Sequence, residues 1–176
     1  NTGSEVKGVG NGANFWPYVF RTQPIRWLDL PKNRLGDKEY LTDRLGSEAC
    51  NFIDANKDKP FFLYLTHYAV HTPIQAKPEL KKKYQAKKPT ERHKNPAYAA
   101  MIESTDDSVG AVLATLDRLE LSDDTLVIFF SDNGGHGGVT SNAPLRGSKG
   151  MLYEGGIREP MIIKWPGVTK PGTVCR

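Results

Sequence analysis

An apolar run that ends in a polar, glycine-rich loop constrains this chain more than any other feature. Residues 125–130 read TLVIFF, and residues 131–138 follow directly with SDNGGHGG. A short apolar run bounded by turn residues is typical of a buried strand. In open α/β sheets, ligands bind beyond the carboxyl ends of the strands. The junction therefore predicts a strand that delivers an acid, an amide and a histidine to a functional edge.

The rest of the chain shows an alternation of helices and strands. Apolar residues at helical spacing predict helices over about 42–56, with Thr42 as the N-cap, and over about 97–119. Continuous apolar runs at 61–65 and 160–165 predict two further strands, the first of them buried on both faces. This order indicates an α/β protein with a largely parallel sheet, whose functional edge also receives His71.

Composition supports a globular protein and limits its class. The chain has 176 residues, of which 38% are hydrophobic and 25% charged, and it has no apolar stretch near the roughly 20 residues that span a bilayer. Residues 1–40, rich in Gly, Asn, Pro and aromatic side chains, predict a loop region with one short strand. The N-terminus has neither an initiator Met nor a signal-peptide pattern, so we expect part of a longer protein.

Two further features concern cysteine and charge. Cys50 and Cys175 allow one disulfide but form neither a disulfide framework nor a zinc site. The net charge of +4 is concentrated in one proline-punctuated segment, where eight cations face two glutamates, which leaves −2 for the rest of the chain. We interpret this segment, residues 77–96, as a solvated basic insertion; attraction of a polymeric anion is the alternative. Its cations are Lys77, Lys81, Lys82, Lys83, Lys87, Lys88, Arg92 and Lys94.

The loop after residue 130 has the chemistry of a cation site. Asp132 and Asn133 offer a carboxylate and an amide oxygen, the hard ligands that Ca²⁺ or Mg²⁺ prefers, although Asp-Asn-Gly is also a common turn sequence. His136 is a candidate metal ligand or acid/base, or else an exposed loop residue. His71 is held in a turn that Pro73 stiffens, and a zinc site with His67 would lack further ligands.

Two cations follow in a second glycine-flanked loop. Arg146 and Lys149 belong to the segment LRGSKG at residues 145–150. Loop cations are usually solvated. Together with a divalent cation and a histidine, however, they would suit an oxyanion such as a phosphate or sulfate ester.

Three motifs in this order resemble the type I sulfatases, the arylsulfatase family. They are KPFFLYL with His71-Thr72-Pro73, SDNG at 131–134, and LRGSKGMLYEGGIREP at 145–160, and the resemblance covers about residues 40–166. It implies an alkaline-phosphatase-like three-layer α/β/α sandwich with a largely parallel sheet. It also implies bound Ca²⁺ and hydrolysis of a sulfate ester through a formylglycine made from Cys or Ser.

The resemblance also implies roles for individual residues. Asp132 and Asn133 would be metal ligands, and His71 and Lys149 would contact the sulfate or the leaving oxygen. Glu154 and Arg158 match the family pattern too, and we interpret them as structural partners around a tight glycine turn. Three further residues lie close enough in the sequence to touch the substrate: His136, Asn142 and Arg146.

The chain departs from the family where the nucleophile is concerned. The modification motif requires Pro or Ala two residues after the Cys or Ser and Arg four residues after it. Cys50 lacks both, and Ser141 has Leu145 at the arginine position. The family's N-terminal acidic pair is also absent. We therefore expect residues 1–176 to be part of a single catalytic domain and inactive alone, with residues 1–40 on the substrate side and 41–166 forming the core.

Alternatives remain open at this point. A phosphatase or phosphodiesterase of the same superfamily is one, and a noncatalytic polyanion-binding module is another. The expected partner is a sulfated small molecule or polysaccharide rather than a nucleic acid. By family resemblance, a secreted, periplasmic or lysosomal location is expected.

Overall fold

The structure, a computed structural model, describes residues 18–19 and 39–175, which form two compact units. The division falls within the long helix α3 (Pro96–Arg118), whose first part belongs to one unit and whose last turns belong to the other. The predicted loop region at 1–40 lies almost wholly outside the described residues. The described part of the first unit is 18–19, 39–87 and 96–112, and that of the second is 88–95 and 113–175.

The first unit is mainly helical. Strand β1 (Tyr18–Val19) pairs antiparallel with β2 (Glu39–Tyr40), and the helices are α1 (Leu41–Asn56), α2 (Pro78–Gln85) and α3 (Pro96–Arg118). The helices predicted at 42–56 and 97–119 are thus confirmed.

The predicted N-cap of α1 is wrong. The N-cap is Tyr40, which makes no side-chain capping bond, and Thr42 lies within the first turn. The side chain of Thr42 is buried, so it faces the interior instead of turning back to the free N–H groups at the helix end.

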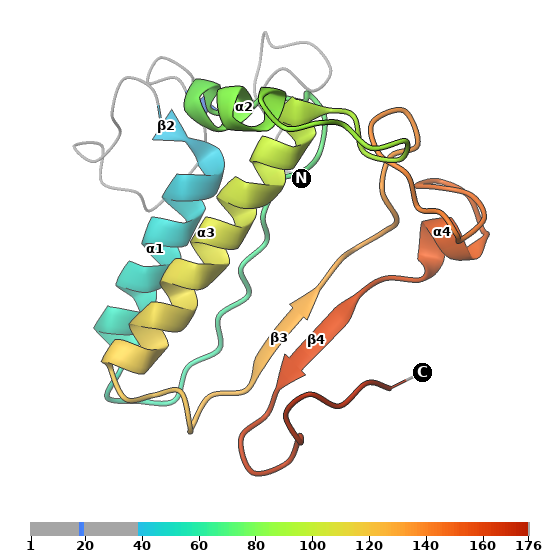
Figure 1. Ribbon diagram of the computed structural model, residues 1–176. Coiled ribbons are helices and arrows are strands. Elements are labelled where there is room, and N and C mark those ends of the chain that lie inside the picture. Colours follow the sequence, from blue (N-terminus) through green and yellow to red (C-terminus); the bar gives the residue numbers. More distant parts are fainter. Residues whose placement is uncertain (1–17, 20–38, 176) are drawn as a thin grey trace, which may run out of the picture. The chain divides into compact units, whose positions relative to one another are not determined.

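Small residues bring α1 close to the first part of α3. A Cβ atom added to Gly46 would collide with the hydroxyl of Ser108, and Figure 1 shows the two helices side by side. Ile53 of α1 and Met101 of α3 are each only 1% exposed. This core buries part of the apolar stripes whose spacing predicted the helices, although Phe52 and Ile102 remain exposed.

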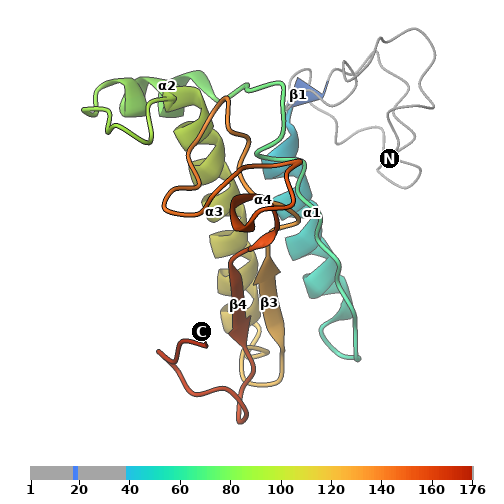
Figure 2. The same ribbon diagram turned by 90° about the vertical axis from the view of Figure 1, so that its right-hand side faces the viewer.

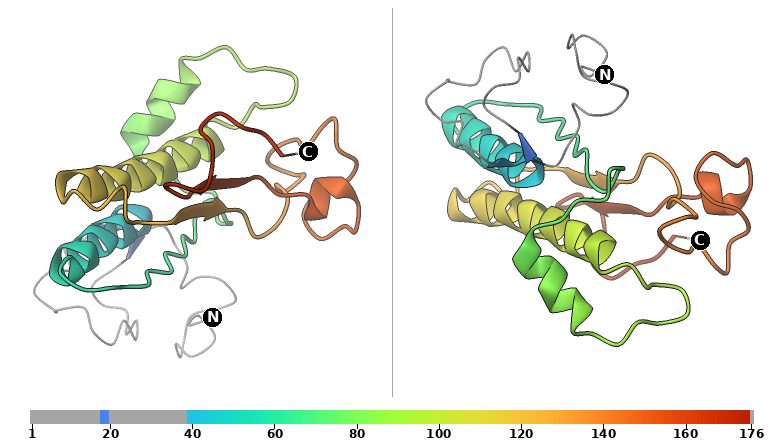
Figure 3. Two further views of the ribbon diagram at one scale, coloured as in Figure 1. Left: turned by 90° about the horizontal axis from the view of Figure 1, so that it is seen from below. Right: turned by 90° about the horizontal axis from the view of Figure 1, so that it is seen from above.

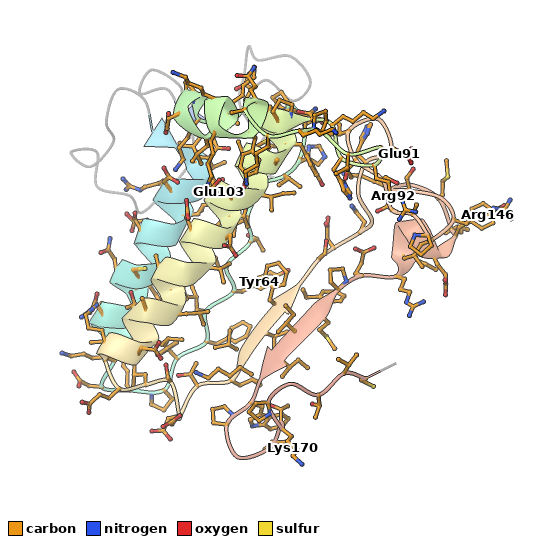
Figure 4. All side chains as sticks on the ribbon, viewed as in Figure 1. Tyr64, Glu91, Arg92, Glu103, Arg146 and Lys170 are labelled. Atoms are coloured by element: carbon orange, nitrogen blue, oxygen red, sulfur yellow. The ribbon has the colours of Figure 1, made fainter. Side chains whose placement is uncertain are left out.

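The segment 61–65 is extended, but it is not a strand. Phe62 is 85% and Tyr64 79% exposed, whereas Phe61, Leu63 and Leu65 between and beside them are part-buried. The prediction of burial on both faces is therefore wrong. A strand needs a hydrogen-bonded neighbour, and the strand pairs of the described residues are β1–β2 and β3–β4. Figure 4 labels Tyr64, the last exposed ring of this run.

Part of the basic insertion is a helix, which its proline-punctuated sequence did not predict. Pro78 occupies the first turn of α2, where a missing N–H costs nothing. Glu79 lies near the N-terminus and Lys82 and Lys83 near the C-terminus, as the helix dipole favours. The ammonium of Lys83 lies 2.5 Å from the carboxylate of Glu103 on α3, but α2 has no buried residue.

The second unit contains two of the predicted strands, and they pair with each other. Strands β3 (Val127–Phe130) and β4 (Met161–Lys164) confirm the strands predicted at 125–130 and 160–165. The short helix α4 (Glu154–Ile157) comes between them in the sequence, and Figure 2 shows it above both strands. They pair antiparallel from Val127 opposite Lys164 to Phe130 opposite Met161.

The prediction of a largely parallel sheet fails for this pair. Residues 131–160 leave β3 and re-enter β4 at the same end, as both panels of Figure 3 show, and such a return produces antiparallel neighbours. The chain is α/β. No helix within the described residues is long and apolar enough to cross a membrane.

Candidate functional site

Backbone hydrogen bonds hold the loops between β3 and β4 together. The N–H of Gly134 donates to the carbonyl of Gly156 at 3.1 Å, and the N–H of Gly155 donates to the carbonyl of Arg146 at 2.7 Å. The N–H of Lys149 donates to the carbonyl of Gly135 at 3.2 Å. Three stretches that carry candidate site residues are therefore joined through their main chains.

Glycine is required where these loops meet. A Cβ atom at Gly134 would collide with the carbonyl oxygen of Gly155, and one at Gly155 would collide with the carbonyl oxygens of Arg146 and Gly147. Both positions are buried. Glu154 and Arg158 flank this glycine turn. The guanidinium of Arg158 lies 3.6 Å from the carboxylate of Glu154, which agrees with their interpretation as structural partners.

Asp132 and Asn133 lie directly beyond the end of β3. Asp132 is exposed. The side-chain Nδ2 of Asn133 donates to the carbonyl of Gly134 at 3.1 Å, which leaves Oδ1 as the amide atom that can reach a cation. The hydroxyl of Ser131 donates to the carbonyl of Asn133 at 3.2 Å and steadies the turn.

These two residues fit a hard cation but cannot enclose one. Ca²⁺ takes about six to eight oxygen ligands. Among the residues that the structure describes, no group of three or more His, Cys, Asp or Glu side chains gathers in a way that would hold a metal. Further ligands would have to come from elsewhere in the protein.

Glu159 is a neighbour of this turn that the sequence did not indicate. Burial raises the pKa of its carboxyl, a hydrogen bond from Ser131 opposes that shift, and the charge of Asp132 adds to it. In the sequence, Glu159 is marked only by its position just before β4. Because β4 pairs with β3, this position places Glu159 near the turn that follows β3.

His136 and Asn142 are both engaged by the main chain. The N–H of Gly138 donates to Nδ1 of His136 at 2.9 Å, so a neutral imidazole here carries its proton on Nε2. The amide of Asn142 forms two bonds of 2.9 Å with Gly135, donating to its carbonyl and accepting from its N–H. Asn142 thus stabilises the loop. A substrate that contacts its side chain would have to bind the same Oδ1 and Nδ2 atoms that bond to Gly135.

Arg146 and Lys149 differ in how their side chains are placed. The guanidinium carbon of Arg146 lies 3.9 Å from the ring centroid of Tyr153, and the side chain is exposed, as Figure 4 shows. Lys149 is part-buried. One compact unit therefore contains all but one of the predicted site residues: Asp132, Asn133, His136, Asn142, Arg146 and Lys149.

His71 belongs to the first unit, and its surroundings are described within that unit. Its Nδ1 lies 2.8 Å from the carbonyl of Thr72, which can only accept, so Nδ1 carries a proton and Nε2 has the lone pair when the ring is neutral. The hydroxyl of Tyr68 also lies 2.9 Å from Nδ1 and donates to the carbonyl of Thr72 at 2.6 Å. The imidazole of His71 is therefore held from one side.

His67 and the two cysteines form no metal site among the described residues. The Nε2 of His67 lies 3.2 Å from the hydroxyl of Ser108, and burial lowers the pKa of the imidazole. Cys50 is part-buried within α1, Cys175 is exposed, and both are free thiols, so the disulfide that the sequence allows is not formed.

A turn within the basic segment contacts the site loops, which the sequence did not reveal. The N–H of His93 donates to the hydroxyl of Thr90 at 3.1 Å, and the N–H of Thr90 donates to the carbonyl of His93 at 3.2 Å. The guanidinium of Arg92 donates to the carbonyl of Ala143 at 3.4 Å, and Nδ1 of His93 lies 3.3 Å from the hydroxyl of Thr140.

In this α/β chain, the loops that follow strand β3 bring a carboxylate, an amide oxygen and a lysine into one unit. The chain belongs to the sulfatase family, because the Sulfatase family model matches residues 5–174. It is 42% identical over 163 residues to a sulfatase of Formosa agariphila, covering 86% of this chain and 30% of that protein. It is also 42% identical over 147 residues to the steryl-sulfatase of Rattus norvegicus, covering 77% of this chain and 24% of the enzyme.

Solved structures agree with this assignment. The crystal structure of Ps i-CgsB in complex with k-i-k-neocarrahexaose matches with a TM-score of 0.66 and 42% identity, over 76% of this chain and 30% of that one. The chain thus spans less than a third of the length of these relatives.

Proposed function

We propose that the complete protein hydrolyses a sulfate monoester and that this chain forms part of its catalytic domain, a three-layer α/β/α sandwich. One observation carries the proposal beyond family membership. Gly135, two residues after Asn133, accepts the main-chain N–H of Lys149. The cation ligands and the lysine are therefore fixed within one set of loops, as a site for a sulfate group requires.

In this proposal Asp132 and Asn133 hold Ca²⁺, or Mg²⁺ in its place, through the carboxylate and the amide Oδ1. A bound divalent cation supplies Lewis-acid polarisation of a substrate oxygen. Lys149 adds a positive charge for the sulfate oxygens, and the partial burial of its side chain strengthens that interaction relative to water.

The two loop histidines would act differently because their hydrogen bonds fix different tautomers. His71 keeps its proton on Nδ1, so its Nε2 can take up a proton and deliver it to the leaving oxygen. His136 offers an Nε2–H, which suits a sulfate oxygen or a hydroxyl of the substrate. Arg146 and Asn142 would border the substrate on the same loops.

The nucleophile, a formylglycine, would come from a part of the protein outside residues 1–176. Cys50 lies inside helix α1 and lacks the modification motif, so it is not a candidate. The isolated chain should accordingly not turn over an aryl sulfate, because positioned charges cannot replace a missing nucleophile.

A sulfated carbohydrate is the substrate that we favour. The relatives' names point to different compounds, since one is a steryl-sulfatase and another was crystallised with a neocarrahexaose. Support for a carbohydrate in this chain comes from residues 88–95, whose cations are exposed and suit a substrate with several charges, and whose Arg92 contacts the site loops.

Steady-state kinetics of the full-length protein on an aryl sulfate and the matching aryl phosphate test the proposal. The sulfate should be the better substrate. Lys149→Ala should lower kcat and kcat/KM together, each roughly 30- to 1000-fold. This corresponds to about 2–4 kcal/mol of transition-state stabilisation, by analogy with loss of an oxyanion-hole donor. Lys82→Ala, a change to an exposed lysine of α2, is the control. A preference for the phosphate, or binding of sulfated polymers without turnover, would refute the proposal.

A further inference from the structure

The turn at residues 90–93 is an ordered part of the second unit. The side chain and the backbone N–H of Thr90 form reciprocal bonds with the backbone of His93, which close the turn on both sides. Glu91 and Arg92 occupy its tip, where Figure 4 shows them next to each other. A charged segment with fixed geometry can present a cation in a defined position, which a solvated loop cannot.

The turn is attached to the candidate site by a short series of contacts. Arg92 donates to the carbonyl of Ala143, and the adjacent Asn142 forms two hydrogen bonds with Gly135. Gly135 in turn accepts the main-chain N–H of Lys149. His93 adds a second attachment through the hydroxyl of Thr140. Three residues, Ala143, Asn142 and Gly135, thus connect Arg92 of the turn to the lysine proposed to bind the sulfate that is cleaved.

The charge and hydrogen-bonding capacity of the turn suit an anion. Residues 88–95 carry three cationic side chains and one acid, and all four are exposed. One N–H of the Arg92 guanidinium binds Ala143, and a guanidinium has five N–H groups in a planar fork that matches a sulfate or carboxylate. The other two cations are Lys88 and Lys94.

We propose that Arg92, supported by Lys88 and Lys94, forms an auxiliary anion subsite for a second sulfate group of a multiply sulfated carbohydrate. This subsite is separate from the residues that would bind the sulfate being cleaved, and the inference rests on the proposed function. The substrate would reach from the loop of Lys149 to the turn, so its charge pattern, and not only its cleavable group, would decide how well it binds.

A pair of substrates tests the subsite in the full-length protein. One is a hexasaccharide with a single cleavable sulfate, and the other is the same hexasaccharide with sulfates on neighbouring sugars. Arg92→Gln should raise KM for the second about tenfold more than KM for the first, as expected when one charge-assisted contact is lost. Arg92→Lys should restore part of the difference, because it keeps the charge but not the fork.

A binding measurement separates this inference from the proposed function. In a full-length variant without the nucleophile, Arg92→Gln should weaken the affinity for the multiply sulfated hexasaccharide about tenfold, measured by calorimetry at low salt. If no sulfate ester is hydrolysed but this loss persists, the proposed function fails and the subsite stands. If turnover is normal and both Kd and the ratio of KM values are unchanged, the subsite is refuted.

A matched control excludes a general charge effect. Lys82→Gln removes one exposed positive charge from α2, which belongs to the other unit, and should leave the ratio of KM values unchanged. An equal change in that ratio for Lys82→Gln would overturn the inference. Equal losses on both substrates for Arg92→Gln would also overturn it, because they would show that Arg92 only holds the loop at Ala143.

Discussion

The helix contact of the first unit and the loop cluster of the second both depend on missing side chains, but they differ in what fills the space. Gly46 of α1 faces the side chain of Ser108. Gly134 and Gly155 face carbonyl oxygens of other loops. A side chain can rotate to relieve a new contact, whereas a hydrogen-bonded backbone cannot move without changing the loops that it connects. Substitutions should therefore affect stability in the helical region and activity in the loops.

The largest expected effect tests the chemistry of the loop cluster. In the full-length protein, Asp132→Ala should abolish metal binding and sulfate-ester hydrolysis together, because it removes the only carboxylate among the proposed ligands of the described chain. Metal content by mass spectrometry and turnover of an aryl sulfate measure both losses. Asp124→Ala, an exposed acid in the turn before β3, is the matched control. Unchanged metal content in Asp132→Ala would refute the assignment.

A smaller loss tests the backbone contacts themselves. Gly155→Ala should reduce kcat/KM by about a hundredfold or more, since a displacement of about 1 Å can cost that much and the new methyl group would force the loops apart. Gly110→Ala in α3, where a Cβ atom meets open space, should keep activity and add about 0.5–1 kcal/mol of stability. Equal activity in the two variants would show that the loops yield as easily as side chains.

The helical region should respond through stability. Ile53→Val removes one methyl group from a side chain that is 1% exposed, which should lower the free energy of unfolding by about 0.5–1.5 kcal/mol. The kcat of the folded enzyme should not change. Denaturant unfolding measures the stability of the variant, and an assay of the same preparation measures its kcat. A lower kcat in fully folded Ile53→Val would show that the helical region also affects activity.

The smallest effect depends on pH. Burial lowers the pKa of His67 from its usual 6.5, so the unfolded chain binds a proton there more readily than the folded one. Stability from this source is complete above about pH 6.5 and is lost as the pH falls below it. Unfolding free energies at pH 7.5 and 5.5 should therefore differ less in His67→Gln than in the parent. A larger difference in the variant would contradict the sign.

The fold was predictable wherever a periodic pattern or a bounded apolar run marked an element. Helices α1 and α3 appear within a few residues of their expected places because part of each apolar stripe is buried. Strands β3 and β4 appear where short apolar runs are bounded by turn residues, although most of their side chains are exposed. Helix α2 was missed because it buries nothing, so no apolar stripe marks it. The run at 61–65 was misjudged because pairing depends on a neighbouring strand, and local sequence does not specify that neighbour.

The candidate site was predictable in its residues but not in its contacts. Motifs placed Asp132 and Lys149, but they could not show that Gly135 lies between the two loops. Asn142 was expected near the substrate, yet its visible bonds are to the backbone, because a short amide satisfies a peptide group as readily as a ligand. The contact of Arg92 with Ala143 joins residues 51 positions apart, a separation that no local pattern encodes.

The hydrogen bonds around Gly135 also predict how the site opens. Its carbonyl accepts both the side chain of Asn142 and the main chain of Lys149, and the same loops hold the amides of Gly134 and Gly155. None of these amide protons can exchange with solvent until the hydrogen bonds that the loops share are broken. Their deuterium exchange should therefore give one common free energy of opening, so that the loops behave as a single opening unit and not as independent turns.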